Sequence, residues 1–144
     1  MSNSISIFTD GACRGNPGPG GWGVLIVLEG EEITLYGGEN NTTNNQMEMM
    51  AAIKALEYFQ EKKSIELVTD SSYLKDGIEK WIHGWKKNGW KTSAKKQVKN
   101  QELWMKIDVL NNFHEVQWKW VKGHSGHREN EIADLLANKG IDEL

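Results

Sequence analysis

The sequence lacks the features that are typical of secreted and membrane-spanning proteins. It has one cysteine, Cys13, in 144 residues, so no intramolecular disulfide can form, and a reducing, cytoplasmic setting is expected. No apolar run approaches the roughly 20 residues that a membrane helix needs. The first residues lack the basic and apolar regions of a secretion signal. With 38% hydrophobic and 26% charged residues, disordered and fibrous classes are excluded, and one domain over residues 1–144 is expected.

Acidic residues are absent from one long stretch. Between Lys80 and Gln101 there are seven lysines and no Asp or Glu, whereas the rest of the chain holds ten basic and twenty acidic residues. The formal charge of −3 therefore conceals a basic segment on a body of charge −10. Residues 81–99 also contain three of the seven tryptophans. Two interpretations are open: a surface for a polyanion, or a solubilising loop whose tryptophans anchor in the core.

The pattern of apolar and turn-forming residues predicts an α/β chain. Strands are expected at 5–9, 22–30, 32–38, 65–69 and 115–122, and helices at 46–60, 71–85, 100–113 and 127–140. The first three strands have short connections, which indicates an antiparallel meander. Gly77 weakens the second helix, and the last helix is expected to end near Gly140. The order predicts a mixed sheet with helices packed against it.

Two of these strands end in the same pair of residues, Thr-Asp, at Asp10 and at Asp70. If a helix connects the two strands, they lie parallel and about 4.8 Å apart, so both carboxylates reach one edge of the sheet. Ligands of open α/β sheets bind at that edge. For either aspartate alone, a turn or a helix cap is the simpler interpretation. For the pair, the two interpretations are equally supported.

Glu48 shares its predicted helix face with three alanines and Phe59. Because an unpaired buried carboxylate is costly, Glu48 needs a partner there. The alternative is a capping box in which Asn45 and Glu48 span the first helical turn, and the two roles are compatible.

Spacing alone does not select the remaining polar candidates. Asp134 borders an apolar helical stripe, where a solvated face is the better interpretation. His124 lies in a Gly-flanked loop, where a surface histidine is the default and a mobile proton carrier is the alternative. His127 and Glu131 have the i, i+4 spacing of zinc ligands, but the chain offers few further ligands, so zinc is disfavoured.

The glycines at 18, 20 and 23 match the pattern G-x-G-x-x-G. A dinucleotide site requires this pattern to open a helix. The run VLIVLE that follows favours a strand, and Pro19 lies inside the pattern. These glycines are therefore expected to form a tight loop that leads into a hairpin.

Four segments together resemble the bacterial type 1 ribonuclease H family. They are FTDGACRGNPGPGGWG, TTNNQMEMMAAIKAL, VTDSSY and WVKGHSGHRENEIAD, which run in order from about Ile5 to Ala137. The resemblance covers nearly the whole chain, and its spacing is highly specific. It implies a ribonuclease H-like fold, a five-stranded mixed sheet flanked by helices in the order βββαβα(α)αβα. Residues 81–99 resemble the basic protrusion of the bacterial enzymes.

The resemblance implies an endoribonuclease that hydrolyses the RNA strand of RNA–DNA hybrids and leaves 5′-phosphate and 3′-hydroxyl ends. It assigns a metal-binding set and gives His124 a role in proton transfer or product release. Two Mg²⁺ ions, with Mn²⁺ as an alternative, would neutralise these carboxylates and clamp the phosphate. One ion would activate a water for in-line attack, and the other would stabilise the leaving 3′ oxygen. The metal-binding set is Asp10, Glu48, Asp70 and Asp134.

Substrate contacts are expected in two parts of the chain. The resemblance assigns Asn16, Thr43, Asn44 and Asn45. The main chain near Gly11 and Cys13 is a candidate, by position, for recognising the 2′-hydroxyl together with Asn44 and Asn45. The basic protrusion would track the nucleic-acid backbone without reading its sequence. Its expected contacts are Trp81, Trp85, Lys86, Lys87, Lys91, Lys95, Lys96 and Lys99.

The chain departs from the family pattern in a few places. Ser72 stands where Gln is common, which puts one substrate contact in question, and Cys13 stands where Ser is common. The chain stops at Leu144, earlier than familiar members, so leaner C-terminal packing and lower stability are expected. A separate hybrid-binding domain before the fold is not expected.

Two other functions remain open at this point. A nuclease of the resolvase or transposase type could share the carboxylates, although the basic protrusion and the GHxGHxENE segment argue against it. A non-catalytic hybrid-binding module is disfavoured by the intact carboxylate set. The expected partner is a hybrid duplex rather than a membrane, and the expected state is a monomer.

Overall fold

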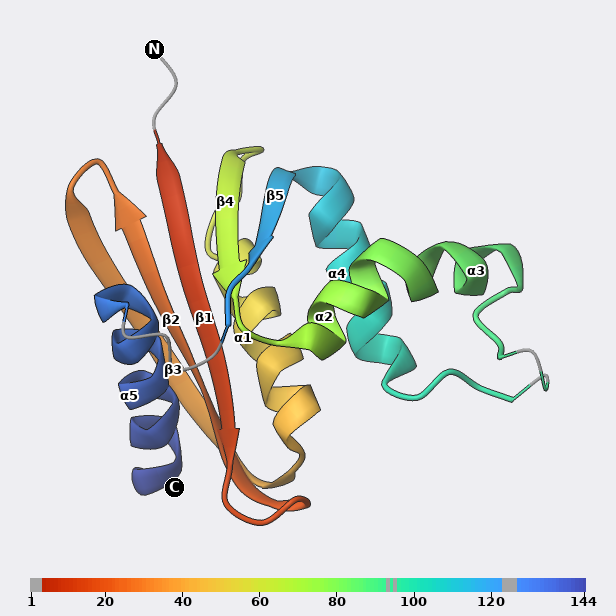
Figure 1. The fold of residues 1–144 in the computed structure, drawn as a ribbon, viewed down its shortest axis with the longest axis horizontal. Helices are drawn as coiled ribbons and strands as arrows, with labels where there is room; N and C mark the ends of the chain where they lie inside the picture. Colours follow the sequence, from red (N-terminus) through yellow and green to blue (C-terminus); the bar gives the residue numbers. More distant parts are fainter. Residues whose placement is uncertain (1–3, 93, 95, 123–126) are drawn as a thin grey trace.

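A computed structural model describes residues 4–92, 94, 96–122 and 127–144 (Figure 1). Its strands form one mixed sheet in the order β3-β2-β1-β4-β5. The first three strands are antiparallel, and β4 runs parallel to both β1 and β5, which confirms the expected arrangement. The strands are β1 (Ile5–Cys13), β2 (Gly18–Leu28), β3 (Glu31–Thr42), β4 (Ser64–Thr69) and β5 (Glu115–Trp120).

The helices lie on both faces of this sheet. Gly11 and Gly20 approach the start of α1 on one face, whereas Gly21 and Gly23 approach α5 on the other. The main core lies between the sheet and the helices α1 and α4, where small alanines allow close packing. The helices are α1 (Asn44–Glu57), α2 (Ser72–Asp76), α3 (Ile82–Lys87), α4 (Gln101–Phe113) and α5 (Arg128–Asp142), with a π-helical turn η1 (Gly77–Trp81).

The first hairpin is longer than the sequence suggested. Residues 11–21, expected as a loop, largely continue the ladder of β1 and β2, and Cys13 pairs with Gly20. Helix α5 packs directly on this part of the hairpin. A Cβ on Gly21 or Gly23 would collide with the backbone of α5, so the close packing requires glycine at both positions. Asp10 therefore lies inside a strand rather than at its end.

Two helices also differ from expectation. The helix expected at 71–85 is divided by η1, and Gly77 lies there against the buried ring of Trp104. Helix α5 continues past Gly140 to Asp142, because this glycine lets the helix touch the backbone of Gly37 rather than ending it. Figure 1 shows α3 projecting away from the sheet. None of the helices in the described ranges is long and apolar enough to cross a membrane.

Candidate active site

The central parallel strands bring Asp10 and Asp70 together. Phe8 pairs with Val68, so continuing the register places the two aspartates level on neighbouring strands. The predicted parallel pairing is thus confirmed. Asp10, Asp70 and Glu48 each offer a carboxylate oxygen, and these oxygens lie within 4.8 Å of one another.

Glu48 reaches this cluster because α1 begins directly against β1. A Cβ on Gly11 would overlap the backbone of Met47 and Glu48, so only glycine permits this approach. Helix α1 is capped by Thr43, whose Oγ1 accepts a hydrogen bond from the Gln46 amide at 3.2 Å. The alternative interpretation of Glu48, a capping box with Asn45, is therefore excluded, since the helix begins earlier and Glu48 is free to face the sheet.

Burial and mutual repulsion shift the acidity of the cluster. The pKa of Asp10 is raised to about 8, first by burial and then by the neighbouring Asp70 and Asp134. Burial raises the pKa of Glu48 well above its ordinary range, and Asp10 and Asp70 add to the rise. Glu48 is 5% exposed, and its Oε1 is buried without a hydrogen-bond partner in the described residues. These carboxyl groups therefore need either protons or a cation at neutral pH.

Asp134 joins the cluster from the opposite face of the sheet. It is half-buried on α5 and lies close enough to Asp10 to help raise the pKa of that carboxyl group. The solvated position that spacing favoured is therefore wrong. Helix periodicity could not reveal this, because the contact depends on α5 lying against Gly21 and Gly23 beside Asp10.

Strand β5 supports Asp70 from the other side. The Trp120 indole N–H donates to the Asp70 carbonyl at 3.2 Å, and the Val121 amide donates to the Thr69 carbonyl at 2.9 Å. The proposed proton carrier His124 follows this strand but lies outside the described residues, as does Lys95. His127 occupies the N-cap position of α5.

The residues expected to contact substrate meet where the first hairpin touches α1. Asn16 Oδ1 accepts a hydrogen bond from the Asn44 amide at 3.0 Å, so the β1–β2 turn is fixed to the start of the helix. Thr43 caps that helix, and Asn45 is partly exposed in its first turn. The Cys13 thiol faces backbone carbonyls, of which Gly15 is nearest at 2.8 Å.

The tryptophans of the basic protrusion, residues 81–99, lie partly in the core and partly on the surface. Trp81 is 36% exposed, and its ring centroid lies 6.0 Å from that of the half-buried Trp85. Trp85 in turn packs on the fully buried Trp104 at 5.8 Å. The core-anchor interpretation is therefore confirmed for Trp85, and a polyanion surface at Trp81 stays a prediction.

The lysines of this segment differ in their pairing. Lys86 forms a salt bridge of 3.2 Å with Asp108. Among the described residues, no carboxylate lies within 4.0 Å of the other exposed lysines of the set, which are Lys87, Lys91, Lys96 and Lys99.

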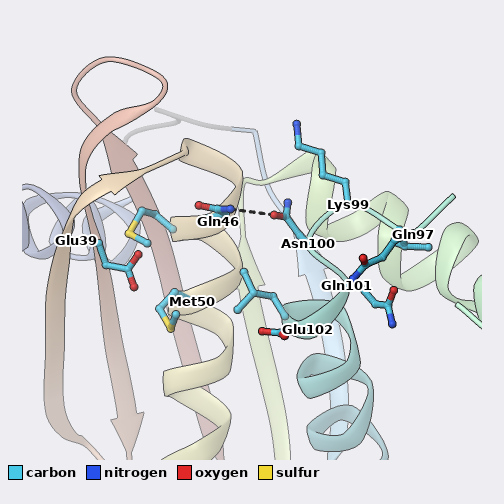
Figure 2. Close-up of a pocket in the computed structure, with 11 residues that line it drawn as sticks. Glu39, Gln46, Met50, Gln97, Lys99, Asn100, Gln101 and Glu102 are labelled. Atoms are coloured by element: carbon cyan, nitrogen blue, oxygen red, sulfur yellow. Dashed lines mark hydrogen bonds between the residues drawn. The ribbon is translucent and has the colours of Figure 1, made fainter. Parts of the chain in front are cut away.

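Sequence reasoning missed a groove of about 590 Å³ between α1 and the start of α4 (Figure 2). Gln46 and Asn100 meet across it, with Gln46 Nε2 donating to Asn100 Oδ1 at 3.0 Å. The available signal was the position of Gln46 three residues after a helix cap, where Gln often completes a capping box. Asn100 offered no periodic signal, because it precedes the helix.

Comparisons with known proteins identify the family. The RNase H family model matches residues 2–142. The ribonuclease H of Pseudomonas fluorescens is 59% identical over 144 residues, which is 100% of this chain and 96% of that protein. The ribonuclease H of Legionella pneumophila strain Corby is 58% identical over 140 residues, which is 97% of this chain and 98% of that protein.

Solved structures agree with the sequence comparison. LC9-RNase H1, a type 1 RNase H with the type 2 active-site motif, superposes with a TM-score of 0.87 at 32% identity, over 99% of this chain and 74% of that one. LC11-RNase H1, solved in complex with an RNA/DNA hybrid, gives a TM-score of 0.73 at 28% identity, over 97% of this chain and 98% of that one. The chain therefore belongs to the RNase H family of endoribonucleases.

Proposed function

We propose that this chain hydrolyses the RNA strand of RNA–DNA hybrids and leaves 5′-phosphate and 3′-hydroxyl ends. The observation that carries the proposal is the convergence of Asp10, Glu48 and Asp70 within 4.8 Å on adjoining elements of the fold. The relatives named ribonuclease H and the hybrid-bound LC11-RNase H1 support the choice of substrate.

The carboxylate cluster fits hard divalent cations. Its donors are all oxygens, one of them buried without a hydrogen-bond partner among the described residues. Burial and the neighbouring Asp70 raise the pKa of Asp10 to about 8, so a bound cation would offset the cost of its charged form. Asp10, Glu48, Asp70 and Asp134 would hold Mg²⁺, with Mn²⁺ as an alternative. Two such ions would supply Lewis acidity toward the phosphate and water activated at neutral pH.

The chain itself supplies rigidity and position. Asp10 lies within β1, and the backbone of Asp70 is tied to β5 through Trp120. Two carboxylates are thus fixed by the sheet, while Glu48 and Asp134 approach from helices on opposite faces. His124, on the segment after β5, is proposed to carry protons or to assist product release.

Substrate binding is proposed to use two surfaces. The first is the junction of the hairpin and α1, with Gly11, Cys13, Asn16, Thr43, Asn44 and Asn45. The second is the basic protrusion, residues 81–99, where Trp81 and Trp85 offer flat surface. Its lysines would neutralise phosphates, and they are Lys86, Lys87, Lys91, Lys95, Lys96 and Lys99. Both would contact the backbone, so cleavage would show little sequence preference.

The test is incubation of the purified chain with a labelled RNA–DNA hybrid and Mg²⁺, alongside single-stranded RNA, duplex DNA and a four-way junction. The hybrid alone should be cleaved, EDTA should abolish cleavage, and end analysis should find 5′-phosphates. Asp10→Asn should lower the rate by more than about 10³-fold while the fold survives. Cleavage of the junction instead would indicate a resolvase-type nuclease, and binding without cleavage would indicate a non-catalytic module.

A further inference from the structure

The side-chain amide of Gln46 is engaged at both ends. Its Oε1 accepts a hydrogen bond from Thr42 Oγ1 at 2.9 Å. Its Nε2 donates to Asn100 Oδ1 at 3.0 Å, the bond that Figure 2 draws. A Gln three residues after the N-cap often reaches back to the cap amide. Here the side chain crosses the groove instead, so it links α1 to a distant part of the chain.

Asn100 is held from two sides in an uncommon backbone conformation. Its φ of 59° lies in the left-handed region, and its side chain does not cap α4. Its Nδ2 donates to the Tyr73 hydroxyl at 3.1 Å, and that hydroxyl also accepts from Trp104 Nε1 at 3.3 Å. The Asn100 amide is therefore clamped between Gln46 and the aromatic cluster beneath the protruding segment.

Asn100 directly follows the basic protrusion, residues 81–99, at the point where the chain enters α4. Lys99 directly precedes Asn100, and both line the groove that Gln46 crosses. Among the hydrogen bonds of the described residues, Gln46 to Asn100 is the one that joins α1 to the segment 97–100. Gln46 also lies one residue after Asn45, in the turn that carries the first proposed binding surface.

We propose that Gln46 is a positioning residue that sets the spacing between the two substrate-binding surfaces. Its hydrogen bond would hold Asn100, and with it residues 97–99 at the end of the basic protrusion, against the first turn of α1. Preorganising both surfaces lowers the ordering cost of binding a duplex that touches both. This inference rests on the proposed function, because it assumes that the hybrid spans the two surfaces.

The test compares Gln46→Met, which keeps side-chain length but removes both hydrogen bonds, with Gln101→Met. Gln101 lines the same groove, and within the described part of the chain its side chain hydrogen-bonds only to Met105 Sδ. Gln46→Met should raise KM and hybrid Kd by about 3–10-fold, the worth of one net hydrogen bond, and leave kcat within about twofold. Gln101→Met should change neither constant.

A double-mutant cycle separates positioning from a general loss of structure. In an Asn100→Ala background, Gln46→Met should have no further effect on KM, because nothing remains for it to hold. The inference would be overturned if Gln46→Met left KM unchanged. It would also be overturned if Gln46→Met raised KM by the same factor in the wild-type and Asn100→Ala backgrounds. Should Gln46→Met fail to fold, Tyr73→Phe loosens Asn100 from its other side and should raise KM in the same way.

The two proposals fail in different ways. Hybrid Kd is measured in EDTA and cleavage is measured in Mg²⁺ with the same wild-type protein. A wild type that binds without cleaving overturns the proposed function, while the Kd values of the variants still decide the role of Gln46. A wild type that neither binds nor cleaves overturns both.

Discussion

Asp10 holds a proton that an ordinary aspartate would lose. Its pKa of about 8 in the folded chain compares with 3.8 in the unfolded chain, chiefly because of burial and then because of Asp70. Between these values the folded state binds more protons than the unfolded state. The metal-free protein therefore has its full stability contribution from this site below about pH 4 and loses it as pH rises through about 8. Glu48 acts in the same direction.

The first prediction follows from this linkage. In EDTA, Asp10→Asn should stabilise the protein at pH 8 by roughly 1–3 kcal/mol, and much less at pH 5, because it removes a carboxylate that is costly when charged. Urea unfolding at the two pH values measures the difference. Glu31→Gln, at an exposed carboxylate, serves as the control and should show no such gap. If the unfolding free energy of the wild type rose relative to that of Asp10→Asn between pH 5 and pH 8, the raised pKa of Asp10 would be contradicted.

His114 is a buried residue that joins the end of α4 to α1 and to the segment just before β4. Its Nδ1 accepts from the Lys63 amide and its Nε2 donates to the Leu56 carbonyl, each at 3.0 Å. His114→Ala would leave both backbone groups unpaired and should cost about 2–4 kcal/mol in unfolding free energy. His114→Gln restores one partner and should lose less, so equal losses in urea unfolding would show that volume rather than hydrogen bonding matters.

Sequence reasoning at the residue scale succeeded where one strand or one helix carried the signal. The repeated Thr-Asp and the apolar face around Glu48 made Asp10, Asp70 and Glu48 candidates, although a turn or a cap remained equally supported for the aspartate pair. The structure brings the three carboxylates together. Asp134 was carried by resemblance alone, because its partner Asp10 lies on another element. Gln46 could not be found either, since its role depends on a left-handed residue far along the chain.

The elements themselves were predicted in order but not in length. The glycines of the first hairpin are typical of a loop, yet they lie within paired strands. They are glycines because α5 packs so closely on the hairpin that a side chain would collide with the helix backbone. The π-helical turn was invisible in sequence for a similar reason. Gly77 weakens any helix by propensity, but the position of the turn reflects its contact with Trp104, a residue of α4.

Gly77→Ala tests this contact. A Cβ there would overlap the buried Trp104 ring, so the variant should lose about 1–3 kcal/mol in urea unfolding, as overpacked sites do. Gly84→Ala is the matched control, since it lies in α3 with open space around its Cβ. That change should instead stabilise the protein by about 0.5–1 kcal/mol through helix propensity. Equal effects of the two changes would contradict the packing argument.

Over the whole molecule, charge is divided between a basic protrusion and an acidic body. Replacing the lysines of the set by Ala should weaken hybrid binding and flatten the dependence of log Kd on log salt, because fewer counterions are released. Fluorescence anisotropy over a salt series measures the slope. The lysines are Lys86, Lys87, Lys91, Lys95, Lys96 and Lys99.

Single substitutions provide an internal control. Lys87→Ala should change the salt slope by up to about 0.9, the contribution of one phosphate contact. Lys86→Ala should change it less, because Asp108 already pairs with Lys86. An unaltered slope in the multiple variant would assign these lysines to solubility rather than to binding.

Strand β1 is the middle strand of the sheet, flanked by β2 and β4. Asp10 follows residues 6–8, which pair with both β2 and β4 and whose backbone opens to solvent only when the sheet separates. Its neighbouring amides would exchange their hydrogens for deuterium at the pace of global unfolding, well after those of exposed turns. Any ligand captured by Asp10 would consequently slow deuterium uptake throughout the strands, including ones that never touch it.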